Sequence, residues 1–74
     1  MSEFKELELE IDDLGDEIAQ GHLASVMRGI NGVHTARITA TGVHVIYNSL
    51  GVTREEIARA VVNAGFKVDY KQPG

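Results

Sequence analysis

The sequence has 74 residues, a formal net charge of −4 and no cysteine, which predicts one small domain over residues 4–71, with short flexible ends at 1–3 and 72–74. The negative charge argues against nucleic acid as a partner, because neutralising phosphates dominates nucleic-acid affinity. The longest apolar run is far shorter than the roughly 20 residues that span a bilayer, the acidic start does not resemble a secretory signal, and the lack of cysteine fits the cytoplasm.

Residues 4–11 alternate between hydrophobic and acidic side chains, which predicts a half-buried strand. Its inward positions are Leu7, Leu9 and Ile11, and its outward positions are Glu6, Glu8 and Glu10. Asp12, Asp13 and Gly15 then interrupt the alternation and offer acceptors for a helix N-terminus.

A helix is expected from about residue 16 to residue 28. Its hydrophobic residues recur at helical spacing, namely Ala19, Leu23, Val26, Met27 and Ile30, and Asn31-Gly32 is expected to end it. Gly21, within the helix, costs about 1 kcal/mol relative to alanine.

A hairpin follows the first helix. A strand is expected over residues 33–40, with Ala36, Ile38 and Ala40 facing inward. Thr41-Gly42 is expected to form the tight turn, and residues 43–47 return with Val43, Val45 and Tyr47 inward.

The last part of the sequence predicts a helix and a strand. Thr53-Arg54-Glu55-Glu56 has the spacing of a capping box, and hydrophobic residues from Ile57 to Ala64 continue at helical spacing. Gly65 is expected to cap this helix, and Phe66, Val68 and Tyr70 are expected in a final strand. The resulting order, βαββαβ, predicts an α+β ferredoxin-like fold: a four-stranded antiparallel sheet with two helices on one face.

Several motifs in this order resemble the heavy-metal-associated domains of copper chaperones and metal-pumping ATPases. The segments that carry the resemblance are Ile30-Asn31-Gly32-Val33, Val43-His44-Val45-Ile46-Tyr47-Asn48, Glu55-Glu56-Ile57 and Ala64-Gly65-Phe66. In that family a Met-x-Cys-x-x-Cys loop precedes the first helix. Here Leu14 stands at the methionine position, Asp16 at the first cysteine and Ala19 at the second.

The resemblance implies metal binding, trafficking or transport, but this loop has no thiolate to hold Cu(I). Leu14 is expected to support the loop from below, as the family's methionine does, and Phe66 matches the aromatic residue beside the loop. The frame of the loop is therefore expected to remain without its sulfur ligands.

Oxygen and nitrogen ligands are the alternative for a metal. Asp12, Asp13, Asp16 and His22 are the candidate ligands, for a weakly held divalent ion such as Zn, Ni, Co or Cu(II). His22, however, lies about 9 Å along the helix from Asp16. Carboxylates at a helix N-terminus are also favoured as caps by the helix dipole, and we prefer that interpretation.

A partner surface is the other hypothesis. Glu6, Glu8, Glu10 and His44 are expected on the open face of the sheet, where they would attract a basic protein surface. The edge strand with Thr35, Arg37 and Thr39 offers pairing with a second copy. His34 is expected far from the first loop.

The sequence shows no nucleophile motif or phosphate-binding loop, so we expect no enzymatic activity. Two functions stay open: a heavy-metal-associated-like domain of metal trafficking or transport, whose partner is a transporter or accessory protein, or an interaction module that kept the fold and lost the metal.

Overall fold

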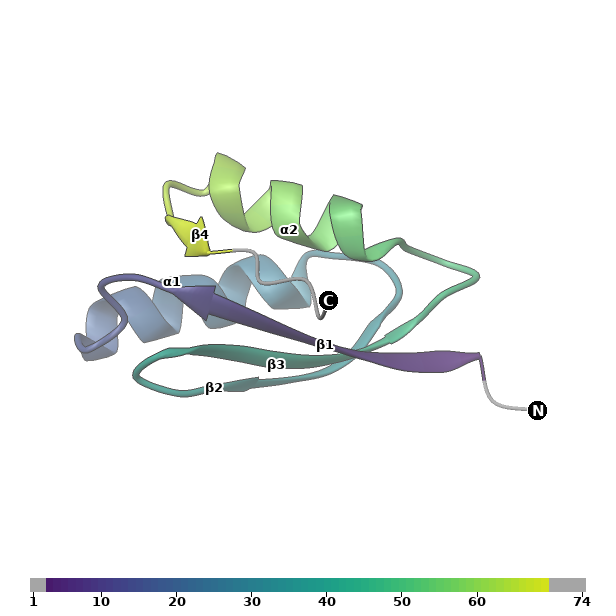
Figure 1. The fold of residues 1–74 in the computed structure, drawn as a ribbon, viewed down its shortest axis with the longest axis horizontal. Helices are drawn as coiled ribbons and strands as arrows, with labels where there is room; N and C mark the ends of the chain where they lie inside the picture. Colours follow the sequence, from purple (N-terminus) through teal and green to yellow (C-terminus); the bar gives the residue numbers. More distant parts are fainter. Residues whose placement is uncertain (1–2, 70–74) are drawn as a thin grey trace.

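The computed structural model describes residues 3–69, which form six elements in the predicted order (Figure 1). Their bounds are β1 (Phe4–Ile11), α1 (Glu17–Arg28), β2 (Val33–Ile38), β3 (Gly42–Asn48), α2 (Arg54–Asn63) and β4 (Val68–Asp69). Tyr70, predicted in the last strand, and the predicted ends at residues 1–2 and 72–74 lie outside the described residues. None of the described helices is long and apolar enough to cross a membrane.

The sheet has the strand order β2-β3-β1-β4, and each neighbouring pair is antiparallel. Both helices lie on one face of this sheet, which leaves the other face open (Figure 1). This is the ferredoxin-like arrangement that the βαββαβ order predicted. In the central pair, Leu9 lies opposite Val43 and Glu8 opposite His44, so hydrophobic side chains share one face and polar side chains the other.

The core lies between the sheet and the helices. Its fully buried side chains include Leu14, Leu23, Met27, Val45, Ile57 and Val61. Leu9 and Ile11 of β1 are buried as the alternation predicted, and Glu6, Glu8 and Glu10 are exposed. The observed core therefore agrees with the one that strand alternation and helical periodicity predicted.

The sequence predicted most of the residues that cap the two helices. The hydroxyl of Thr53 accepts a hydrogen bond from the Glu56 amide at 3.2 Å, and it donates to the Glu56 carboxylate at 3.3 Å. Gly65 follows α2 with φ at 101°, the left-handed conformation that a helix C-terminus favours in glycine. α1 ends at Arg28, as predicted, and the residue that caps it is Gly29 rather than Asn31 or Gly32.

The hairpin between β2 and β3 differs from the prediction. Ile38 lies opposite Val43, and the Thr39 amide donates to the Gly42 carbonyl at 2.8 Å, so Ala40 and Thr41 form the turn. Ala40 is exposed rather than inward. Phe66 also precedes β4 instead of lying in it.

Gly42 is needed for close approach rather than for the turn. The described glycines with positive φ are Gly32 and Gly65. A Cβ built on Gly42 would overlap the carbonyl oxygen of Leu9 and would lie 3.0 Å from its carbonyl carbon. Backbone proximity to β1 therefore explains the glycine.

At the end of the molecule opposite the first loop, Gly32 contacts the segment between β3 and α2. The Gly32 carbonyl accepts a hydrogen bond from the Asn48 amide at 2.7 Å. Its φ is 100°, and a Cβ there would lie 2.8 Å from a methyl group of Val52. The segment after α1 and the segment before α2 therefore pack directly on each other.

Candidate functional site

The first loop, residues 12–16, is held in place at both of its ends. The Asp12 amide donates to the Lys67 carbonyl at 3.1 Å, which joins the loop to the segment before β4. Leu14 is fully buried, and its carbonyl accepts a 2.6 Å hydrogen bond from the Gln20 side chain. Asp13 has φ at 63°, a left-handed conformation that aspartate tolerates better than most residues. Leu14 thus packs beneath the loop as predicted.

Asp16 caps α1. Its carboxylate accepts a hydrogen bond from the Ile18 amide at 3.1 Å, and its carbonyl accepts one from the Gln20 amide at 3.0 Å. Glu17 adds a second negative charge to the first turn, where the helix dipole favours it. Ala19 is half-buried against the core and has no donor atom. The geometry favours the capping interpretation.

His22 contacts an aromatic ring. Its ring centroid lies 5.5 Å from that of Phe66, with the two planes inclined by 43°. Phe66 also packs against the core, so it supports α1 beside the loop.

The four candidate ligands do not form a metal-binding group. Within residues 3–69, no three histidine, aspartate or glutamate side chains are placed to hold one metal ion. The predicted set of Asp12, Asp13, Asp16 and His22 is therefore not brought together here. The physical reason is that Asp16 faces the amides of α1 while His22 lies farther along the helix against Phe66.

The open face of the sheet brings together residues that were predicted to share it, through contacts that the sequence did not predict. The imidazole of His44 lies between two carboxylates: its Nε2 is 2.9 Å from Glu6 and its Nδ1 is 3.3 Å from Glu8. Glu8 lies directly opposite His44 in the register, and Glu6 lies opposite Ile46. The alternation along β1 and β3 indicates the shared face, because Glu6, Glu8 and His44 all occupy outward positions of their strands. His34, as expected, lies elsewhere, 5.1 Å from the ring of Phe4.

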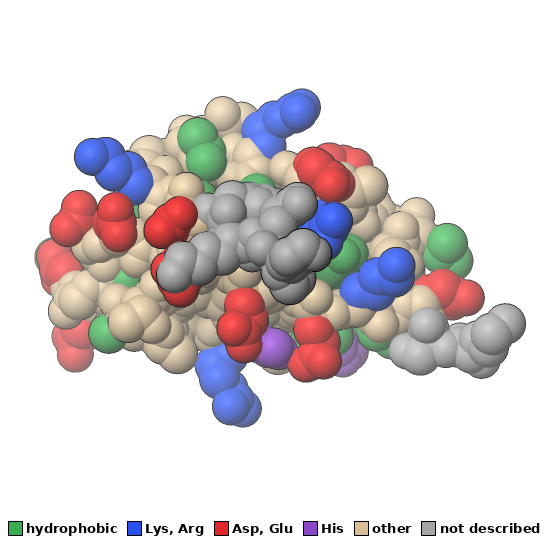
Figure 2. Space-filling model, viewed as in Figure 1, with side chains coloured by type: hydrophobic (Ala, Val, Ile, Leu, Met, Phe, Trp, Pro, Cys, Tyr) green, Lys and Arg blue, Asp and Glu red, His purple; other side chains and the backbone are tan. Residues whose placement is uncertain are grey.

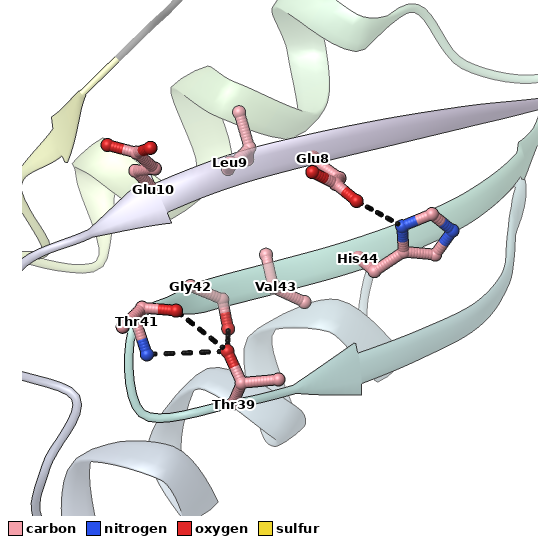
Figure 3. Close-up of a pocket in the computed structure, with 8 residues that line it drawn as sticks. All are labelled: Glu8, Leu9, Glu10, Thr39, Thr41, Gly42, Val43 and His44. Carbon is pink, nitrogen blue, oxygen red and sulfur yellow. Dashed lines mark hydrogen bonds and ion pairs between the residues drawn. The ribbon is translucent and has the colours of Figure 1, made fainter.

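A shallow hollow of about 240 Å³ opens beside this histidine (Figure 3). Its polar lining includes Glu8, Glu10, Thr39, Thr41 and His44. The Thr39 and Thr41 hydroxyls lie 3.3 Å apart. Because the two imidazole nitrogens point in different directions, Glu6 and Glu8 cannot join His44 around a single ion. The arrangement offers charge and hydrogen-bonding groups to a partner rather than a closed reaction site.

Comparison with known proteins tests the fold independently. No family model matches the sequence, and no curated protein is significantly similar to it. Solved structures do match, and this chain covers 89–100% of the length of the matched chains. The chain has the fold of heavy-metal-associated domains.

Three of the structures with this fold show how complete the match is. The putative copper-ion-binding protein from Bacillus anthracis str. Ames superposes with a TM-score of 0.84 at 20% identity, over 93% of this chain and 100% of the other. Oxidized MerP from Ralstonia metallidurans CH34 gives 0.83 at 14% identity, over 93% and 99%. A copper binding domain from HMA7, a P-type ATPase, gives 0.81 at 17% identity, over 86% and 89%.

The heavy-metal-associated fold therefore spans nearly the whole of this chain, as the motifs predicted. This chain differs from the Met-x-Cys-x-x-Cys pattern at Asp16 and Ala19, because it has no cysteine. The fold is that of metal-binding chaperone domains, while the loop lacks the sulfur ligands.

Proposed function

We propose that this chain is a non-enzymatic domain of a metal-trafficking or metal-transport system that acts by binding another protein and does not hold Cu(I). The observation that carries the proposal is the first loop. Its frame is retained, with Leu14 fully buried beneath it, while Asp16 serves as the cap of α1. A soft cation needs thiolate or thioether ligands, and neither Asp16 nor Ala19 provides one.

A non-enzymatic role is supported by the groups on the surface. The first loop presents helix-capping carboxylates, and the hollow on the sheet face is shallow and lined by carboxylates, hydroxyls and one imidazole. A nucleophile with a base in hydrogen-bond reach would be the usual sign of covalent catalysis, and the sequence motifs for one are absent. We place the domain in the cytoplasm, with a transporter, an accessory protein or a second copy as its partner.

Metal titration followed by amide NMR tests the proposal. The ¹⁵N-labelled chain receives Cu(I), Zn(II), Ni(II), Co(II) or Cu(II) in separate samples. Cu(I) is expected to leave the amides of residues 12–22 unshifted at a few equivalents. Loop-specific shifts with Cu(I) would show that the proposal is wrong. Such shifts with a divalent ion would instead support the weak site of Asp12, Asp13, Asp16 and His22.

The matched control restores the missing sulfurs. In the double variant Asp16→Cys/Ala19→Cys the two thiols stand at the first turn of α1, where the helix N-terminus lowers thiol pKa values. This variant is expected to bind one Cu(I), with shifts confined to the loop and the first turn. A variant that folds but does not bind would refute the claim that the loop keeps its frame.

A further inference from the structure

β2 lies at the edge of the sheet, and among residues 3–69 no strand covers its outer side (Figure 1). The Thr39 amide donates to the Gly42 carbonyl, and in an antiparallel pair hydrogen-bonded positions alternate with non-bonded ones. Counting back from Thr39, the amides and carbonyls of Ala36 and Ile38 stand at non-bonded positions and point away from β3. We call this stretch of β2, from Ala36 to Ile38, the β2 edge. The register irregularity between β2 and β3 comes before it, so the β2 edge is regular and able to pair.

The side chains of the β2 edge that face the helices are only partly covered. Ala36 and Ile38 pack against the core but are half-buried, whereas Val45 and Val43, their partners in β3, are buried. The difference arises because β2 has a neighbouring strand on one side only. A further strand at this edge would remove more of this hydrophobic surface from water, which is favourable.

A hollow of about 260 Å³ opens beside the β2 edge, between α1 and β2. A cavity of about 150 Å³ holds a benzene molecule, so this hollow has room for an aliphatic side chain. When an extended segment joins a sheet, main-chain hydrogen bonds give affinity and pockets for alternate side chains give specificity. The β2 edge and the hollow provide both. The residues that line the hollow are Ala24, Met27, Arg28, Val33, His34 and Ala36.

This edge carries positive charge in a chain whose net charge is −4. Arg37 lies opposite His44 and so on the open face, Arg28 lies in the last turn of α1, and both are exposed. Neither arginine forms an ion pair within the described part of the chain. Figure 2 shows acidic side chains over the middle of the sheet and at the end where α1 begins, whereas positive charge extends from the lower edge, along which β2 runs in Figure 1.

The charge of the edge selects among possible occupants. A second copy joined β2 to β2 would bring Arg28 and Arg37 of both chains together, and β2 contains no carboxylate to offset them. The acidic strand of this chain, β1, is already paired with β3 and β4. An extended segment that alternates hydrophobic and acidic side chains complements the edge, because alternate residues of a strand face opposite sides of the sheet.

We infer that the β2 edge is a docking site for an extended segment of a partner protein, which joins the sheet beside β2 and alternates hydrophobic with acidic side chains. Its backbone bonds the free amides and carbonyls of Ala36 and Ile38. One aliphatic side chain enters the hollow beside Ala24, and an acidic side chain faces Arg37. The inference rests on the proposed function, because it names the surface and the kind of partner through which the domain acts.

The test begins with selection of random linear peptides on the immobilised full chain. The enriched sequences are expected to alternate hydrophobic residues with Asp or Glu. Amide hydrogen exchange of the ¹⁵N-labelled protein with the most enriched synthetic peptide is the decisive measurement. The amides of Ala36 and Ile38 are expected to exchange at least about tenfold more slowly in the complex, because they gain hydrogen bonds. The Arg37 amide, at a position already bonded to β3, is expected to change less.

Two pairs of variants locate the contact. Arg37→Gln is expected to weaken the peptide by about two- to fivefold, whereas Arg59→Gln removes the same charge from the exposed side of α2 and should have no effect. Ala24→Leu fills the hollow and should weaken the peptide by about tenfold. Ser25→Leu adds the same side chain at the next, exposed position of α1, which does not line the hollow, and should leave binding unchanged.

Several results would overturn the inference: no enriched peptide, a consensus without acidic residues, no slowing at Ala36 and Ile38, or equal effects of Arg37→Gln and Arg59→Gln. Slowing of the same two amides as protein concentration rises, without peptide, would assign the edge to a second copy and would also overturn it. Cu(I) titration of the same preparation separates the two claims. A failed selection with no Cu(I) binding removes only the docking site, whereas Cu(I) binding at the first loop removes the proposed function.

Discussion

Replacing Gly42 with alanine is predicted to destabilise the domain strongly. The added methyl group would overlap the carbonyl oxygen of Leu9 and lie 3.1 Å from the Cα of Glu10. These atoms belong to the backbone of β1, so no side-chain rotation relieves the overlap. Either β1 and β3 must separate or the hairpin must shift.

The expected loss is about 2–3 kcal/mol in the free energy of unfolding, the upper part of the range for overpacked sites. A chain of this size has roughly 4–11 kcal/mol in total, so the variant loses a large share of it. At about 4–8 °C for each kcal/mol in a domain of 60–100 residues, the melting temperature should fall by roughly 8–24 °C.

Gly21→Ala is the matched control. Gly21 lies inside α1, and a Cβ there would meet nothing within 4 Å. Alanine should stabilise this helix by about 0.5–1 kcal/mol. Both substitutions reduce the entropy of the unfolded chain to a similar extent, so their difference reports the steric overlap. Urea unfolding followed by circular dichroism measures both. Two variants with shifts of the same sign would refute the close-approach explanation of Gly42.

Further predictions concern the core, the caps and the charges. Leu14→Ala removes a fully buried side chain and should cost about 2–5 kcal/mol in urea unfolding, while the loss of no more than 1 kcal/mol would contradict its role as the anchor of the loop. Thr53→Ala should cost about 1 kcal/mol, because it removes the acceptor for the Glu56 amide, and Thr53→Ser should recover most of that loss. His44→Ala should change stability by less than about 1 kcal/mol, since its carboxylate partners are exposed. The pKa of Glu55 lies below its ordinary value of 4.5, owing first to a hydrogen bond from its own backbone amide and then to the charge of Arg54. Its contribution to stability is therefore present above that value and is lost as pH falls through the lowered pKa, so Glu55→Gln should differ from the wild type at neutral pH and converge with it in acid.

The sequence was sufficient for most of the fold because neighbouring signals agreed. The alternation of residues 4–11 predicted β1 at its observed bounds. Asp16 and Thr53 marked the starts of both helices, and Gly65 marked the end of the second. Such local preferences are readable without tertiary information because each depends on a few adjacent residues.

The errors arose where distant backbone decides the conformation. Gly42 looked like a turn residue, yet its neighbour in space is Leu9, 33 positions earlier in the sequence. The bracket of Glu6 and Glu8 around His44 likewise depends on the register between β1 and β3. The alternation along each strand predicted that Glu6, Glu8 and His44 share one face of the sheet, but it could not predict which of them are in contact.

At the candidate site the sequence itself shows that the loop has no cysteine, and it predicted the buried position of Leu14. The helical periodicity also left Ile18 off the buried stripe of α1, and Ile18 is exposed. The contact between His22 and Phe66 also needed the placement of α1 against the segment before β4.

The junction at Gly32 bears on how this fold can change its chemistry. Gly32, Asn48 and Val52 join the two crossover segments at the end far from the first loop, and Asp16 at the near end is exposed. A lineage can therefore exchange the residues at positions 16 and 19 without disturbing the contacts that set the topology. The ligand chemistry of the loop can then change through two substitutions, provided that Leu14 stays buried beneath the loop and that the residue at position 16 still caps α1.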